Sequence, residues 1–242
     1  MEHVRIVTDS TSELPRAVAA DLGITVVPMS VRFGAKEFRD GVDIDTESFF
    51  KYLRESKTPP VTIPPSAKEF EEVYGRLVKD SDEILSIHLS GKLSQTCAMA
   101  TRGALPYLGR KSIVVVDSLI TSYGLGYLAM EAAEAARAGA GLEEIVRLLR
   151  TLIPRVYLVF FVENLEHLYR GGRLNIAQTM VASVLNLKPL LGIEEGELVL
   201  LEKVRTRQRA LEKLSEFVLE FNRVHKLTVV HSGNSSEVSE LV

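Results

Sequence analysis

The sequence of 242 residues contains a single cysteine, Cys97, and this scarcity excludes an intrachain disulfide. A lone thiol fits a reducing compartment, and we therefore expect a cytoplasmic protein. The neighbours of Cys97 are Ala98, Met99 and Ala100, which indicates a packed thiol and not a nucleophile. No window contains the ~18 consecutive apolar residues that a membrane-spanning helix needs. Residues 1–5 lead directly into an apolar strand pattern, so neither a signal peptide nor membrane insertion is expected.

The sequence also has little net charge, because 29 lysines and arginines stand against 32 aspartates and glutamates, a balance of −3. Such a balance gives no general attraction to nucleic acid or to an anionic membrane. The five histidines are scattered, and no pair has the helical spacing of a transition-metal site. The G-x-S-x-G nucleophile elbow and the P-loop are absent as well. From these motifs we predict neither a metal nor a cofactor.

What the sequence does contain is the composition of an ordinary globular protein, with 46% hydrophobic and 25% charged residues. Through residue 152, short apolar runs alternate with amphipathic segments, which is typical of a doubly wound, mostly parallel α/β domain. The run at 112–117 lacks polar alternation, which indicates a central strand covered on both faces. The expected strands of this domain cover 4–8, 24–31, 83–89 and 112–117. The expected helices cover 45–55, 67–79, 122–138 and 142–152, and two more are expected, one ending near residue 22 and one beginning near residue 97. Residues 32–41 are expected to form a polar loop.

The pattern changes near Pro154, after which antiparallel pairing is expected. Two short strand patterns are joined by Glu194-Glu195-Gly196, which indicates a hairpin. We therefore expect two domains: an N-terminal α/β domain over 1–154, and a smaller α+β domain over 155–242 with a mixed or antiparallel sheet. Expected strands of the second domain cover 156–162, 190–193, 197–204 and 227–231, and expected helices cover 163–169, 176–187 and 206–223.

The stretch 83–96 is the strongest candidate for a ligand site. It reads as a buried strand, a polar turn and the beginning of a helix. In an open parallel sheet, ligands bind where the carboxyl ends of strands meet the N-termini of helices. The same pattern also suits a serine or threonine helix cap with no ligand. The polar side chains of the turn are Ser90, Lys92, Ser94 and Thr96.

Two other segments are unusual. Residues 58–66 contain four prolines, which exclude a helix and favour a stiff, extended loop ending at Ser66, the expected cap of the next helix. Arg170-Gly-Gly-Arg173 combines a glycine turn, which exposes backbone N–H groups, with two guanidiniums that can bind a carboxylate or a phosphate. A solvated charged face is the alternative interpretation of these arginines and of those at 205, 207 and 209.

Gly124-Leu-Gly126-Tyr-Leu-Ala129 matches a dinucleotide-binding fingerprint and supports an alternative function, a nucleotide-binding α/β enzyme. In that fingerprint the first glycine directly follows a strand, whereas six residues separate Asp117 from Gly124. Close packing of a helix through small residues is the favoured interpretation. Asp9 and Asp117 each end a strand, where they can be helix caps, hydrogen-bond acceptors or magnesium ligands, in that order of preference.

Taken together, these stretches resemble the DegV family, the bacterial fatty-acid-binding proteins that serve as substrate-presenting subunits of fatty acid kinase. The order and spacing of the matching segments hold along essentially the whole chain. Those segments are IVTDSTSEL (6–14), TIPPS (62–66), SIHLSGKLSQT (86–96), VVDS (115–118), YGLG (123–126), GGRL (171–174), LNLKP (185–189) and VRT (204–206).

The resemblance implies a non-enzymatic lipid carrier that buries a long-chain fatty acid such as palmitate between two α/β domains, with no other cofactor. Thr62 and Ser94 match the two residues whose hydroxyls bind the carboxylate in the family. A kinase partner, the ATP-binding subunit, would phosphorylate that carboxylate to an acyl phosphate, and Arg173 and Arg205 match the family's arginines for this step. The neighbours of the carboxylate would be Ser90, Gly91, Lys92 and Thr96.

The sequence departs from the family pattern near the proposed ligands. Ile63-Pro64 replace a serine and a glutamine after Thr62, Gly91-Lys92 replace a serine and a glycine, and Gln95 replaces the glycine after Ser94. The chain stops at Val242, before the family's closing strands and their histidine-containing, glycine-rich loop. Either the sequence is incomplete or the protein lacks part of its second domain.

Overall fold

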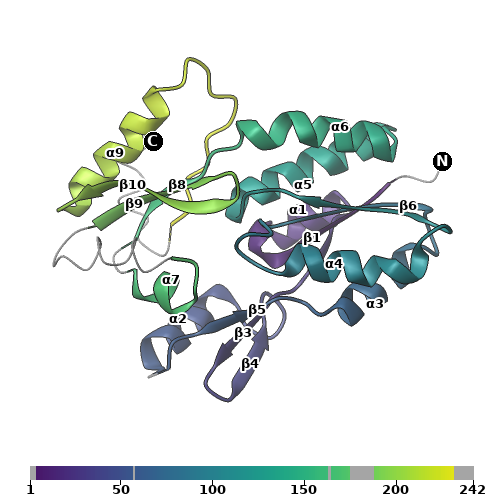
Figure 1. Ribbon diagram of the computed structural model, residues 1–242, viewed down its shortest axis with the longest axis horizontal. Helices are drawn as coiled ribbons and strands as arrows, with labels where there is room; N and C mark the ends of the chain where they lie inside the picture. Colours follow the sequence, from purple (N-terminus) through teal and green to yellow (C-terminus); the bar gives the residue numbers. More distant parts are fainter. Residues whose placement is uncertain (1–3, 57, 163–164, 175–187, 232–242) are drawn as a thin grey trace. The chain divides into compact units, whose positions relative to one another are not determined.

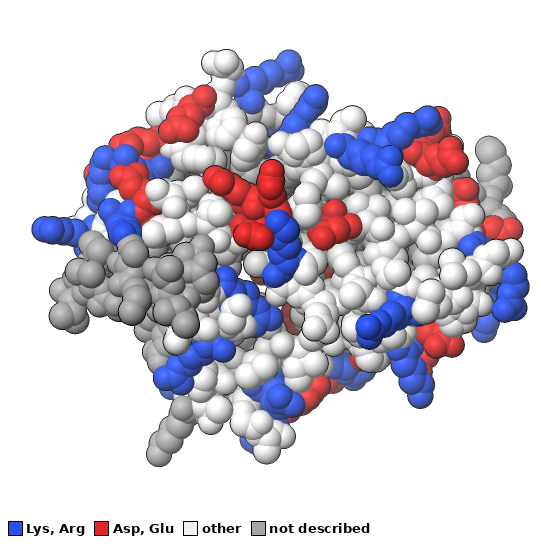
Figure 2. Space-filling model, in the orientation of Figure 1, with Lys and Arg blue, Asp and Glu red and all other residues white. Residues whose placement is uncertain are grey.

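A computed structural model describes residues 4–56, 58–162, 165–174 and 188–231 of the chain (Figure 1). The chain forms two compact units. The first comprises Met1–Leu158 together with Glu194–Glu197, and the second comprises Val159–Ile193 and Leu198–Val242. On the face shown in Figure 2, basic and acidic side chains are interspersed, in keeping with the small net charge. None of the helices in the described part of the chain combines the length and the apolarity that crossing a bilayer requires.

A four-stranded parallel sheet is the centre of the first unit, as the alternation of strand and helix predicts. Its order is β2 (Thr25–Val27), β1 (Arg5–Asp9), β6 (Glu83–His88) and β7 (Ser112–Asp117). All neighbouring strands run parallel. Parallel strands end at the same edge of a sheet, so Asp9 and His88, the last residues of β1 and β6, lie at one edge. This is the edge at which α/β proteins bind ligands.

Helices cover both faces of this sheet (Figure 1). On one face, α3 (Ala67–Leu77) and α4 (Thr96–Ala104) form a buried cluster with strand residues such as Val7 and Ile84. On the other face lie α5 (Ser122–Arg137) and α6 (Leu142–Leu152), whose ranges match the sequence prediction within a residue. The remaining short elements of this unit are η1 (Ser10–Ser12), α1 (Arg16–Asp21), η2 (Leu105–Tyr107) and η3 (Ile153–Arg155).

The predicted position of β7 is wrong. It occupies an edge of the four-stranded sheet, not its centre, and its residues are half-buried except Ser112, which is exposed. An apolar run without alternation indicates a strand whose faces are covered, and α4 does contact β7. Coverage of faces does not require a strand on each side, so the pattern cannot distinguish an edge from a centre.

A second, smaller sheet of the first unit was not predicted. Its order is β4 (Lys36–Arg39), β3 (Ser30–Phe33) and β5 (Val61–Ile63), all antiparallel. The predicted strand over 24–31 is therefore two strands in different sheets, because Pro28 has no N–H and the amide of Met29 donates to Ser10 Oγ at 3.0 Å.

This small sheet also corrects the two predicted loops. Residues 32–41 contain strand β4, and the proline-rich segment contains β5, whose edge position tolerates flanking prolines. The helix α2 (Thr46–Glu55) begins at the predicted cap, since Asp45 accepts a hydrogen bond from the amide of Ser48 at 2.8 Å. The apolar residues that join helix and sheet are Val31, Phe33, Phe38, Ile44, Phe49, Tyr52 and Leu53.

The second unit contains most of a three-stranded sheet in the order β10 (Glu197–Val204), β9 (Lys188–Glu194) and β8 (Val159–Phe161), while the hairpin end Glu194–Glu197 is grouped with the first unit. The predicted hairpin is confirmed, and its two turn residues, Glu195 and Gly196, have φ values of 48° and 85°. A two-residue turn with both φ values positive matches the twist of antiparallel strands. The described helices of this unit are α7 (Glu166–Arg170) and α9 (Arg207–Leu219).

Two predictions for the second unit remain. The predicted strand over 227–231 is wrong, because these residues form no strand and Leu227 and Val230 are 55% and 53% exposed. A segment with a strand-like sequence pattern becomes a strand only when it forms backbone hydrogen bonds with a partner strand. No strand in the described part of the chain pairs with residues 227–231. The predicted helix over 176–187 lies outside the described residues.

Candidate functional site

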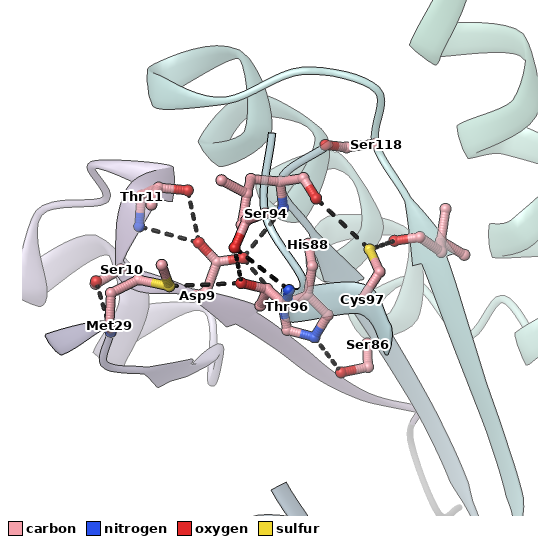
Figure 3. A network of polar contacts seen from close by, with 12 residues as sticks. Asp9, Ser10, Thr11, Met29, Ser86, His88, Ser94, Thr96, Cys97 and Ser118 are labelled. Carbon is pink, nitrogen blue, oxygen red and sulfur yellow. Dashed lines mark hydrogen bonds and ion pairs between the residues drawn. The ribbon is translucent and has the colours of Figure 1, made fainter. Parts of the chain in front are cut away.

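A buried carboxylate joins the ends of β1 and β6 (Figure 3). Asp9 Oδ2 accepts hydrogen bonds from His88 Nδ1 at 3.0 Å and from the amide of Leu89 at 3.1 Å. Its other oxygen, Oδ1, accepts from the amide and the hydroxyl of Thr11, at 3.1 and 2.6 Å. The side chains of Asp9 and His88 are fully buried. Asp9 is thus both the cap of η1 and a buried acceptor, the first two of its three predicted roles.

Behind this pair, His88 continues a chain of polar side chains. His88 Nε2 lies 2.7 Å from Ser86 Oγ, and the phenol of Tyr74 in α3 donates to the same Ser86 oxygen at 2.8 Å. His88 is thus a hydrogen-bonded histidine of the core. Serine, histidine and aspartate are spaced here as in a hydrolase triad. Ser86 is fully buried in β6 and engaged by Tyr74, so no substrate carbonyl can reach it and it is not a nucleophile.

The loop after β6 is held by Ser90. Its hydroxyl donates to the carbonyl of Gly196 at 2.7 Å, and its carbonyl accepts from the amides of Leu93 and Ser94 at 3.0 and 3.1 Å. Ser90 is fully buried. These bonds fold residues 90–94 into a compact turn, and they make Ser90 a structural hydroxyl of that turn.

Two neighbours of Ser90 make contacts of their own. The amide of Gly91 donates to Asp117 Oδ2 at 3.0 Å, and a Cβ on Gly91 would lie 2.8 Å from that oxygen. Lys92 is half exposed, and its ammonium lies 3.1 Å from Glu197 Oε1. Asp117 is therefore an acceptor at the carboxyl end of β7, and the charge of Lys92 has a partner.

Ser94 lies two residues before the start of α4. Its Oγ lies 2.9 Å from Thr96 Oγ1 and accepts from the amide of Thr96 at 3.3 Å. The N-cap residue Gln95 makes no side-chain cap hydrogen bond. The first amides of a helix carry partial positive charge and favour an anion. A carboxylate is therefore chemically suited to this half-buried hydroxyl and helix end.

Thr62 comes from a different sheet, in β5, where it pairs with Val31 of β3. A connection to the Ser94 segment runs through Met29, immediately before β3. Thr96 Oγ1 lies 3.5 Å from Met29 Sδ, and Figure 3 shows Met29 beside Thr96. The structure thus links the strand pair that carries Thr62 to the helix end that carries Ser94.

Arg173 and Arg205 belong to the second unit. Arg173 follows the predicted glycine turn, in which Gly172 has φ 71°, and its guanidinium donates to the carbonyl of Gly171 at 2.6 Å. Arg205 is exposed between β10 and α9. The next residue, Thr206, caps α9 by accepting from the amide of Arg209 at 3.2 Å.

The remaining candidates do not add a metal or nucleotide site. Among the described residues, no group of three histidine, cysteine or carboxylate side chains could hold a metal ion. Gly124 and Gly126 lie inside α5, not in a turn after a strand. A Cβ on Gly126 would lie 2.3 Å from the carbonyl oxygen of Ser12. The predicted close packing through small residues is confirmed, and the nucleotide fingerprint lacks its turn.

Cys97 is a packed thiol, as predicted. Its Sγ lies 3.5 Å from the carbonyl oxygen of Leu89. Burial, and secondarily the charges of Asp117 and Asp9, raise the pKa of the thiol to about 12. The thiolate is the reactive form, so a raised pKa makes the residue inert at neutral pH.

We expect Cys97 to resist alkylation by iodoacetamide in the native protein. With a pKa near 12, the thiolate fraction at pH 8 is about one in 10,000, against roughly a quarter for an unperturbed thiol. The native protein should therefore react about 2,500-fold more slowly than the protein in guanidinium chloride, as measured by mass spectrometry. Equal rates in the two conditions would contradict the packed environment.

Sequence reasoning missed the partners of His88. The sequence did not indicate that Asp9 and Ser86 would bond the imidazole, or that Tyr74 would bond Ser86. Asp9 and His88 both end apolar runs that were predicted as strands of one parallel sheet, and this shared position was the available signal. No local pattern marks Tyr74, because its partner lies in another element.

Comparison with known proteins agrees with this architecture. The model of the DegV family of uncharacterised proteins matches residues 3–242. A DegV domain-containing protein of Caldanaerobacter subterraneus is 39% identical over 90% of this chain and 77% of its own length. A fatty acid binding DegV family protein from Thermus thermophilus has a TM-score of 0.81 and 36% identity, over 90% of this chain and 77% of that one. DegV from Bacillus subtilis, a fatty acid binding protein, has a TM-score of 0.83 and 31% identity, over 91% and 78%. The chain described here belongs to the DegV family.

Proposed function

We propose that this chain binds a long-chain fatty acid and holds its carboxylate with the hydroxyls of Thr62 and Ser94. The observation that carries the proposal is the Ser94 hydroxyl at the N-terminus of α4, whose N-cap residue, Gln95, makes no side-chain cap hydrogen bond. A carboxylate placed there gains a hydroxyl donor and the favourable end of the helix dipole. The fatty acid binding of DegV proteins from Thermus thermophilus and Bacillus subtilis supports the same ligand class.

The acyl chain supplies most of the affinity in this proposal. A palmitate-sized tail has on the order of 14 methylenes, each worth roughly 0.8 kcal/mol when buried, or about 11 kcal/mol before ordering costs. Each hydroxyl contributes about 1.5–3 kcal/mol to the binding of a charged carboxylate. The tail thus determines how tightly the ligand binds, and Thr62 and Ser94 determine where the carboxylate lies.

The residues around Ser94 have distinct roles in this proposal. Ser90 shapes the loop through Gly196, and Gly91 allows the close approach of Asp117. Lys92 is paired with Glu197, so its substitution for a family glycine adds no unpaired charge beside the ligand. Thr96 orients the Ser94 hydroxyl at 2.9 Å. The departures at Gly91 and Lys92 are therefore compatible with a carboxylate at Ser94.

We further propose that the chain is a carrier without catalytic residues of its own. It presents the carboxylate to the ATP-binding subunit of a fatty acid kinase, which forms the acyl phosphate. Arg173 and Arg205 serve this step in the proposal, because a guanidinium binds phosphate in a bidentate geometry. The exposure of Arg205 and the left-handed turn before Arg173 support this role.

We expect native mass spectrometry of the purified protein to detect a co-purified fatty acid. After delipidation, the double variant Thr62→Ala, Ser94→Ala should bind palmitate at least ~100-fold more weakly than wild type, because two hydrogen bonds to the carboxylate, worth about 1.5–3 kcal/mol each, are lost. Isothermal titration calorimetry measures this difference. Thr101→Ala is the matched control, since Thr101 is an exposed residue of α4 whose hydroxyl bonds the carbonyl of Cys97 at 2.9 Å. Equal palmitate affinity in the double variant and wild type would refute the proposed ligands.

A further inference from the structure

We infer that four buried side chains, Tyr74, Ser86, His88 and Asp9, form a relay that positions Ser94 and the end of α4 for the carboxylate. The inference rests on the proposed function and assigns these four as positioning residues, since none of them touches the ligand. All four are nearly or fully buried. We call this set of four side chains the buried relay.

The relay ends at the carboxylate of Asp9, each of whose oxygens accepts two hydrogen bonds. Asp9 receives two amide donors, from Leu89 on Oδ2 and from Thr11 on Oδ1, at 3.1 Å each. The imidazole of His88 and the hydroxyl of Thr11 add one contact to each oxygen. Because amides only donate, both oxygens of Asp9 must accept. An asparagine in its place would present an NH₂ group to one of these two sides.

The hydrogen bonds of the relay run in one direction. Tyr74 donates its phenol proton to Ser86 Oγ. The Ser86 hydroxyl can then donate its own proton to Nε2 of His88, and the Nδ1–H of His88 donates to Asp9. Burial raises the pKa of the Tyr74 phenol, which keeps it a donor. Each side chain thus uses its proton once, and this fixes the tautomer and the orientation of the imidazole.

The relay connects the segments that lead to both proposed ligands. Tyr74 lies on α3, which begins at Ala67 soon after the β5 strand of Thr62. Ser86 and His88 lie on β6, which leads into the loop of Ser94. Asp9 lies before η1, where Ser10 Oγ accepts from the amide of Met29. One buried chain of bonds therefore joins α3, which follows the strand of Thr62, to β6, which precedes the loop of Ser94.

The most direct control over Ser94 is exerted through Leu89. Leu89 is the first residue after β6, and its amide donates to Asp9 Oδ2 at 3.1 Å. The direction in which the chain leaves the strand is set by this bond. The amide of Ser94 then bonds the carbonyl of Ser90 at 3.1 Å, so the loop has little freedom between the two contacts. A misplaced Asp9 would shift the Ser94 hydroxyl.

Comparing two ligands, one with a carboxylate and one without, measures how far the buried relay affects binding of the ligand's carboxylate. Palmitate and hexadecanol have the same tail length, so the ratio of their dissociation constants reports the carboxylate interaction alone. We expect wild type to prefer palmitate. In His88→Leu this preference should fall about tenfold, because Asp9 loses its imidazole donor and shifts. Fluorescence displacement with the delipidated full chain measures both constants.

Two further variants separate positioning from a loss of stability. His88→Asn places an amide nitrogen where Nδ1 lies, and by keeping the donor to Asp9 it should restore most of the preference for palmitate. Leu149→Ala removes a fully buried side chain of α6 and should lower the unfolding temperature with the preference unchanged. If His88→Leu does not fold, Tyr74→Phe keeps the volume and removes only the first donor, and the preference should fall about threefold.

The outcomes distinguish the inference from the proposed function. If wild type prefers palmitate and both His88→Leu and Tyr74→Phe keep that preference, the relay is not a positioning device and the inference is overturned, while the proposed function stands. A fall of the same size in Leu149→Ala would also overturn it, because the effect would then follow stability. If wild type itself shows no preference for palmitate over hexadecanol, the proposed carboxylate ligands and the inference both fail.

Discussion

Gly126→Ala should destabilise the first unit, although alanine is the better helix former. The new Cβ would lie 2.3 Å from the carbonyl oxygen of Ser12, far inside contact distance. Alanine favours a helix by about 1 kcal/mol over glycine, so the steric cost must exceed this gain. The neighbour is backbone of η1, and its movement is opposed by the bonds of Asp9 to Thr11. We expect a net loss of about 2–3 kcal/mol in the free energy of unfolding.

Urea denaturation followed by circular dichroism measures this loss. Gly75→Ala is the matched control, because it adds the same methyl group to a helix, α3, where the nearest atom is the hydroxyl of Tyr107 at 2.7 Å. That hydroxyl is the end of a side chain and can move away, so the control should be within ~1 kcal/mol of wild type. A Gly126→Ala protein as stable as the control would contradict the close packing of α5 on η1.

The packing around Gly126 also shows what sequence patterns can predict. The alternation of strand and helix through Leu152 predicts the parallel sheet and the helices α5 and α6 within a residue of their bounds. Such patterns work because each element repeats its apolar residues with its own period. The small β3–β4–β5 sheet was missed, since Lys36–Arg39 is a polar edge strand and Val61–Ile63 is a three-residue strand between prolines. Pro28 was the available signal that the run 24–31 is divided.

The candidate site divides in a similar way. Ser94 and Thr96 could be placed from sequence, because a strand followed by hydroxyl residues and a helix marks the ligand edge of a parallel sheet. The partner of His88 could not be assigned, since Asp9 lies 79 residues away in the chain. Ser90 resembles its neighbours in sequence but bonds Gly196, 106 residues away. A long-range hydrogen bond such as that of Ser90 identifies a hydroxyl with a structural role. No local sequence pattern encodes such a bond, so the sequence alone could not assign this role.

Arg173→Ala, Arg205→Ala should lower acyl-phosphate formation by about 100-fold or more when the chain is combined with ATP and the ATP-binding subunit of a fatty acid kinase. In the proposed function these guanidiniums stabilise the charge of the transferring phosphoryl group. The affinity for palmitate should remain that of wild type, because Thr62 and Ser94 hold the carboxylate. Trapping the acyl phosphate with hydroxylamine measures the rate, and calorimetry measures the affinity.

The matched control for this pair is Arg209→Ala. Arg209 is an exposed arginine of α9 whose guanidinium already pairs with Glu212 at 2.8 Å and Glu216 at 3.0 Å, so its loss should leave the rate unchanged. Arg205→Lys should recover only part of the rate, since an ammonium keeps the charge without the bidentate geometry. A wild-type rate in the double variant would refute the role of both arginines. Palmitate affinity that falls in parallel with the rate would instead place them at the carboxylate, because an arginine that acts only on the phosphoryl group changes the rate without changing ligand binding.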